Sequence, residues 1–79
     1  MNISIDSLRI SAASWRACNP EHSGGVVLLW QGVVYGWKDS LRDPGDERPG
    51  AFAVAEDGQI YVAEGGEKSN GAQRWSAVS

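Results

Sequence analysis

The chain contains one cysteine and one histidine among its 79 residues. A single cysteine excludes an intramolecular disulfide, and we expect Cys18 to be a small buried hydrophobic residue. Cys18 and His22 together fall short of the three or four ligands of a zinc site, so we expect no metal and no cofactor. A Cys18–His22 nucleophile pair would need a third, orienting group, which the sequence does not supply, and Pro20 lies between the two. We therefore expect no catalytic residues, with His22 in a solvated loop and a small hydrolase as the enzymatic alternative.

Long hydrophobic runs are also missing. The apolar run Val26–Trp30 has the length of a strand and is far from the roughly 20 residues of a membrane span. No apolar stretch near the N-terminus has the length of a signal peptide. We expect one soluble domain over residues 1–79 without membrane attachment. Such a small core depends on aromatic rings, so most of the four Trp should be buried, with one or two exposed as interface anchors, Trp37 among them.

The first of two predicted hairpins lies in the middle of the chain. Two β-rich runs, Val26–Trp30 and Val33–Trp37, are separated by the dipeptide Gln31-Gly32. A two-residue connection that ends in Gly is typical of a tight hairpin. The register that follows from such a turn places Leu28 opposite Tyr35.

The second predicted hairpin joins Ala51–Glu56 to Gln59–Glu64 through Asp57-Gly58. Asp-Gly tolerates positive φ at both turn positions, as a type I′ turn requires. This two-residue turn predicts that Val54 faces Tyr61.

The remaining segments complete a small sheet with a helix. Apolar alternation predicts a strand over Ile3–Ile10, after which Ser11 caps a short helix over Ala12–Cys18. A single helical turn is expected at Asp39–Asp43 and a last strand at Gln73–Val78. The predicted fold class is α+β, an antiparallel sheet of about five strands with one short N-terminal helix. A small five-stranded barrel is the alternative.

Charge is unevenly distributed along the chain. The net charge is −3, yet residues 39–67 contain eight acids and two arginines. The acids are Asp39, Asp43, Asp46, Glu47, Glu56, Asp57, Glu64 and Glu67. A negative net charge argues against direct nucleic-acid binding, since phosphate contact needs a basic stripe. Segregated acidity instead favours a basic protein partner, although ordinary solubility charge is an equally simple interpretation.

Carboxylates on a rigid sheet can imitate a nucleic acid. Residues two apart on a strand are separated by about 6.6–6.8 Å, a spacing close to that of successive phosphates. The eight acids, with Trp37 as an anchor, therefore predict a surface that occupies the basic nucleic-acid-binding groove of another protein.

Three segments carry a resemblance to a known class: Gly24–Trp30, Gly36–Pro44 and Arg48–Ala51. With the small size, the acidity and the missing catalytic set, the chain resembles phage-encoded anti-CRISPR proteins directed at type I systems. The resemblance implies a monomeric inhibitor in the host bacterial cytoplasm. It would bind a Cas subunit of a Cascade-like complex and block target DNA binding. A structural or assembly protein of a phage particle is the alternative, and it predicts self-association.

Overall fold

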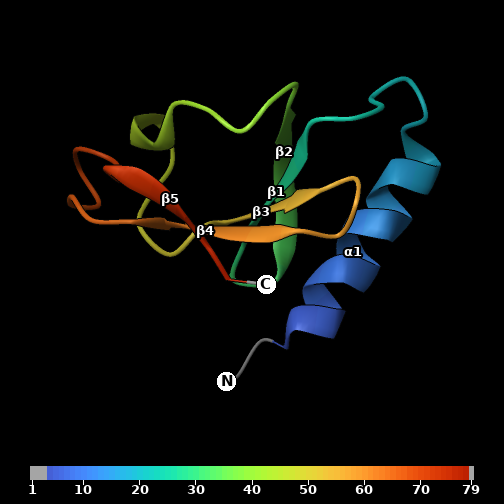
Figure 1. The fold of residues 1–79 in the computed structure, drawn as a ribbon, viewed down its shortest axis with the longest axis horizontal. Coiled ribbons are helices and arrows are strands. Elements are labelled where there is room, and N and C mark those ends of the chain that lie inside the picture. The colour runs from blue at the N-terminus through green and yellow to red at the C-terminus, as the bar shows by residue number, and fades with distance from the viewer. Residues whose placement is uncertain (1–3, 79) are drawn as a thin grey trace.

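A computed structural model of the chain describes residues 4–78. In chain order the elements are α1 (Ile5–Cys18), β1 (Val26–Trp30), β2 (Val33–Lys38), a 3₁₀ turn η1 (Pro44–Asp46), β3 (Phe52–Ala55), β4 (Ile60–Glu64) and β5 (Arg74–Ala77). The strands form one antiparallel sheet in the order β2-β1-β3-β4-β5, which does not close on itself (Figure 1). The predicted α+β class and the last strand are therefore confirmed, whereas the barrel is not supported.

The N-terminal segment is helical, so the predicted strand over Ile3–Ile10 is wrong from Ile5 onward; Ile3 lies outside the described residues. The helix begins earlier than expected because Ser4, not Ser11, is its N-cap: the Ser4 side chain accepts a hydrogen bond from the Ser7 backbone N–H at 3.0 Å. A side-chain cap of this kind satisfies a backbone donor that has no partner within the helix.

Packing explains why the helical period prevails over the apolar alternation. Leu8 and Ala12, four residues apart, are both buried on one side of α1, and Ile5 and Trp15 pack around the same cluster. This spacing defines a helical stripe. The stripe covers one face of the sheet, where it meets Val27, Leu29, Val54 and Ile60.

The first hairpin is confirmed, but its register changes beyond the turn. Gln31 and Gly32 have φ of 52° and 83°, as a type I′ turn requires. A β-bulge between Leu28 and Leu29 then places Leu28 opposite Gly36. The predicted pairing of Leu28 with Tyr35 is therefore wrong, since Tyr35 is the extra residue of the bulge. Tyr35 lies on an edge strand with 48% of its surface exposed.

The second hairpin has a longer turn than predicted. Val54 pairs with Ile60, not with Tyr61. The connection is a three-residue loop, in which the Gly58 N–H donates to the Ala55 carbonyl at 3.0 Å and Gly58 has φ of 92°. A type I turn followed by a left-handed glycine produces this shift by one residue.

The sheet face away from α1 is covered by the segment that follows β2 and by a side chain of β5. Leu41 and Trp75 pack over Val26, Leu28 and Ala53 on this side. The expected helical turn at Asp39–Asp43 is absent there. The single turn forms at Pro44–Asp46 instead, since Asp43 is left-handed at φ 49° and the fixed φ of Pro44 suits a first helical position.

Candidate functional site

Cys18 and His22 do not form a reactive pair. Cys18 is exposed, which corrects the expected burial. His22 is not free in solvent but stacks between Trp15 and Trp37, with ring centroids 5.6 Å and 4.6 Å away. Trp37 also donates from its indole N–H to the Gly24 carbonyl at 3.1 Å. Trp37 is thus engaged with the loop that follows α1. Within residues 4–78 no group of three or more potential ligand side chains is arranged to hold a metal.

Five of the eight acids contact a basic side chain. Asp39 and Asp43 lie 3.1 Å and 2.8 Å from Arg42, which is exposed like them. Asp46 and Glu47 both contact Lys38, and Glu64 lies 3.9 Å from Arg74. Both Lys38 and Arg74 lie outside the acidic stretch in sequence, yet the fold returns them to it.

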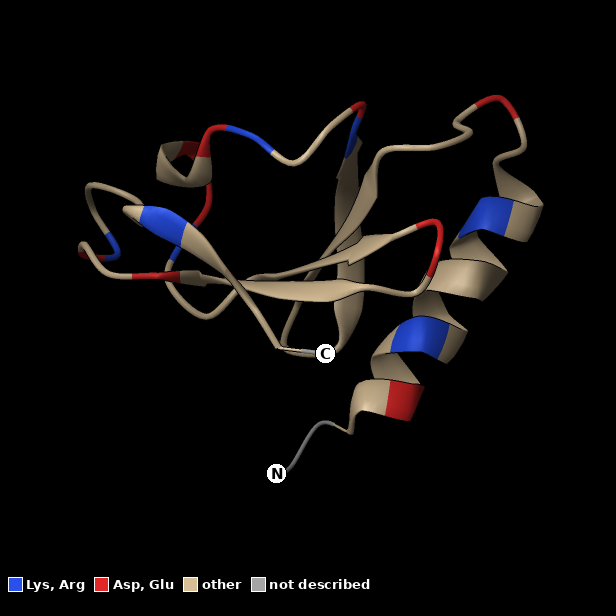
Figure 2. Ribbon diagram, in the orientation of Figure 1, with Lys and Arg blue, Asp and Glu red and all other residues tan. Residues whose placement is uncertain are grey.

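The other three acids lie in two different connections, Glu56 and Asp57 between β3 and β4 and Glu67 between β4 and β5. Glu56 accepts from the Gly24 N–H and Asp57 from the Gln59 N–H, each at 2.9 Å. No hydrogen bond or ion pair involves the Glu67 side chain within residues 4–78. Figure 2 shows the acids distributed over β4 and several connecting segments, on different sides of the molecule. The structure therefore does not bring the eight together on one face, and their role in partner binding stays a prediction.

Glu47 is the clearest departure from an outward-facing acid, because only 6% of its surface is exposed. One of its carboxylate oxygens accepts from Lys38 Nζ at 2.8 Å, and the other accepts from the Tyr35 hydroxyl at 2.5 Å. The Lys38 ammonium also donates to the carbonyls of Arg42 and Asp43, each at 3.0 Å. This network joins β2 to the loop that follows it and leaves no buried polar side-chain atom unpaired in residues 4–78.

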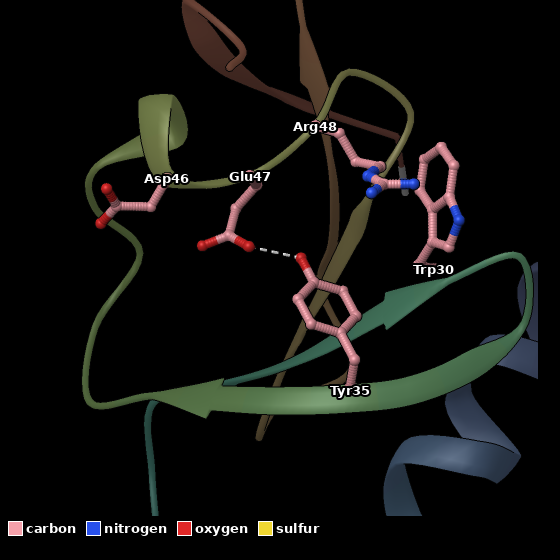
Figure 3. Close-up of a pocket in the computed structure, with 5 residues that line it drawn as sticks. All are labelled: Trp30, Tyr35, Asp46, Glu47 and Arg48. Carbon is pink, nitrogen blue, oxygen red and sulfur yellow. Dashed lines mark hydrogen bonds between the residues drawn. The ribbon is translucent and has the colours of Figure 1, made fainter. Parts of the chain in front are cut away.

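Above this network lies an open pocket of about 330 Å³. It is lined by Trp30, Tyr35, Asp46, Glu47 and Arg48, which come from the β1–β2 hairpin and from residues 46–48 (Figure 3). The Arg48 guanidinium carbon lies 4.9 Å from the centre of the Trp30 ring. The same ring is approached by the Gly50 backbone, where an added Cβ would lie 3.3 Å from it. The ring is therefore fixed between the chain at Gly50 and the arginine.

Exposed apolar surface continues from the pocket along β2. Val33 is 67% exposed and pairs with Trp30 across the tight turn. Trp, Tyr and Arg are the residue types most enriched among the energetically dominant contacts of protein interfaces. Trp30, Tyr35 and Arg48 are not among the site residues that the sequence predicts. The turn residues were a signal for the Trp30–Val33 pair, but no local pattern links Arg48 to Trp30.

The Tyr35 hydroxyl provides a test of the buried network. Burial, the hydrogen bond to Glu47 and the negative charge of Glu47 raise the pKa of Tyr35 well above its ordinary value, and Arg48 opposes this shift only in part. The unfolded side chain ionises near pH 10. The stability that Tyr35 contributes is therefore complete below about pH 10 and is lost as the pH rises from there toward the pKa of the folded state.

We expect the tyrosinate absorbance of the folded protein to show an ionisation later than that of free tyrosine, and Tyr35→Phe to remove it. A late ionisation that persists in Tyr35→Phe would contradict the assignment.

The fold and this site define a small α+β protein with a surface pocket lined by two aromatic rings, two carboxylates and one arginine. Compared with protein-family models, with curated protein sequences and with solved structures, the chain shows no significant match. Its function therefore has to be argued from the chemistry of the site. Within residues 4–78 no helix is long and apolar enough to cross a membrane.

Proposed function

We propose that this chain is a non-catalytic binding protein that acts by occupying the surface of a partner protein. Its docking face consists of Trp30, Val33, Tyr35 and Arg48. The observation that carries the proposal is that Trp30, Tyr35 and Arg48 line one open pocket, while the exposed Val33 on the edge strand β2 pairs with Trp30 beside it.

The network beneath the pocket supports binding over proton transfer. Both Glu47 oxygens are already hydrogen-bonded, to Lys38 and to Tyr35. A carboxylate held in this way fixes the positions of its neighbours, and its burial limits contact with a substrate. Rigid contact residues also lose less conformational entropy on binding than mobile ones.

The sequence resemblance suggests a first partner to test: the crRNA-guided effector complex of a type I CRISPR-Cas system, in the cytoplasm of a host bacterium. In this proposal the chain inhibits by covering a Cas subunit, so that target DNA no longer binds. Contact through the docking face replaces contact through a row of acids as the leading mechanism, since five of the eight acids already contact cations.

A matched pair of surface substitutions tests the docking face. Val33 and Ile10 are almost equally exposed, at 67% and 69%, but Ile10 lies on α1. We expect Val33→Asp to weaken binding to purified type I effector complex by about tenfold or more, because a charge replaces desolvated apolar surface. Ile10→Asp should bind like the unmodified chain. Binding is measured by surface plasmon resonance, and inhibition by the effector's binding to labelled target DNA.

The outcomes test the identity of the partner and the location of the docking face separately. Absence of binding to the complex overturns the CRISPR assignment. Equal effects of Val33→Asp and Ile10→Asp on a bound partner overturn the docking face.

A further inference from the structure

Arg48 differs from the other four arginines of the chain. Arg9 donates to the Gly58 carbonyl, and Arg16 donates to the carbonyls of Gly24, Gly25 and Val54. Arg42 is paired with Asp39 and Asp43, and Arg74 lies near Glu64. Within residues 4–78, the Arg48 guanidinium has no hydrogen bond and no ion pair, and its only specific contact is the Trp30 ring.

The cation–π contact with Trp30 positions the guanidinium without using its hydrogen-bond donors. An arginine side chain presents its N–H groups in a planar fork that matches the two oxygens of a carboxylate. A contact through the ring face leaves this edge free to receive such a group. The Arg48 guanidinium is thus held ready to receive an anion, and Figure 3 shows it beside Trp30 in the lining of the pocket.

We propose that the pocket binds an Asp or Glu side chain of the partner protein, with its carboxylate on Arg48 and an adjacent apolar residue on Val33 and Tyr35. This inference rests on the docking function proposed above. It means that the docking face recognises an acidic group on the partner, whereas the acid-rich sequence predicts a basic partner surface.

The two acids that line the pocket are paired with Lys38 and not with Arg48. Glu47 is neutralised by Lys38 at 2.8 Å, and Asp46 lies 3.7 Å from the same ammonium. One ammonium balances only one of the two carboxylates, so Arg48 brings the pocket close to neutrality, but within residues 4–78 its guanidinium forms no ion pair with either acid. A single guanidinium on a chain of net charge −3 suits one carboxylate better than the phosphate row of a nucleic acid.

Selection from a displayed library of short random peptides tests the inference. Peptides selected on the unmodified chain should share one Asp or Glu beside an apolar residue. The best of them should bind Arg48→Met roughly 10- to 100-fold more weakly, as expected for loss of a charge-assisted hydrogen bond. Arg48→Glu should instead select Lys or Arg at that position. Arg42→Met is the matched control, because Arg42 is an exposed arginine already paired with acids, and it should retain the original peptides.

Each alternative result is decisive. Peptides that depend on Val33 but carry no acidic preference overturn the carboxylate inference and leave the docking face standing. Failure to select any peptide also overturns it, while the binding assay with the effector complex decides the docking function separately. The third measurement is the Trp30 indole N–H resonance in the presence of a single-stranded oligonucleotide. A shift that occurs only when Arg48 is present would show that Arg48 binds phosphate, and it would overturn the proposal. Circular dichroism of Arg48→Met verifies that the fold is intact.

Discussion

Replacing Lys38 with methionine will destabilise the fold by about 3–5 kcal/mol, the usual cost of leaving one member of a buried ion pair without its partner. Glu47 is 6% exposed and the Lys38 side chain 12%, so water replaces the lost ammonium only in part. The substitution also removes the donors to the carbonyls of Arg42 and Asp43. Urea denaturation monitored by tryptophan fluorescence measures the loss.

Two further variants establish the cause. Arg42→Met removes an ion pair that is exposed on both sides, so its effect on stability should be small. Adding Glu47→Gln to Lys38→Met removes the unpaired charge and keeps an acceptor for the Tyr35 hydroxyl, so it should recover most of the stability. If Lys38→Met costs no more than Arg42→Met, the buried pair does not have the structural role assigned to it.

Gly71→Ala is the second substitution with a large expected effect. Gly71 has φ of 82°, and a Cβ there would overlap the carbonyl oxygen of Gly45 in η1. The obstacle is backbone, so neither side can move without displacing the turn beside the pocket. Strain of this kind costs about 3 kcal/mol, which for a domain of this size lowers the melting temperature by roughly 10–20 °C.

Gly24→Ala separates backbone strain from overlap. Gly24 has a similar φ of 69°, but a Cβ there has no heavy atom within 4 Å. Its replacement should cost only the left-handed conformation of alanine, about 1 kcal/mol. If the two variants lower the melting temperature equally, the close approach of Gly71 to Gly45 does not cause the destabilisation.

The strands were predictable because local residues determine them. Gln31-Gly32 defines the first turn, and β-rich runs define the strands on either side. The registers were less predictable, since each depends on one additional residue: Tyr35 in the bulge of β2 and Glu56 in the three-residue turn that ends at Gly58. No local sequence pattern in the predicted strands indicates either additional residue.

The N-terminal helix shows how one apolar pattern can fit two periods. Ile3, Ile5, Leu8 and Ile10 can be read as alternating strand residues. The decisive contacts are non-local, since Leu8 and Ala12 acquire partners only when β1, β3 and β4 assemble beneath them. Tertiary packing therefore selects the helix, with Ser4 setting its start.

Most of the candidate site could not be predicted from the sequence. Charge that is segregated along the chain is not segregated in space, because Lys38 and Arg74 reach into the acidic segment from outside it. The stack of Arg48 on Trp30 joins residues from different elements. Composition predicts how many charges exist, but only the fold determines which of them remain uncompensated.

The bulge in β2 also has a consequence for how this border of the sheet meets other molecules. A regular, flat outer strand offers its main-chain groups to any extended segment and so invites indiscriminate strand addition. An inserted residue breaks that regular spacing and increases the local twist. Recognition at this border is thereby shifted from the peptide backbone, which all proteins share, to the shape and charge of individual side chains, which distinguish one protein from another.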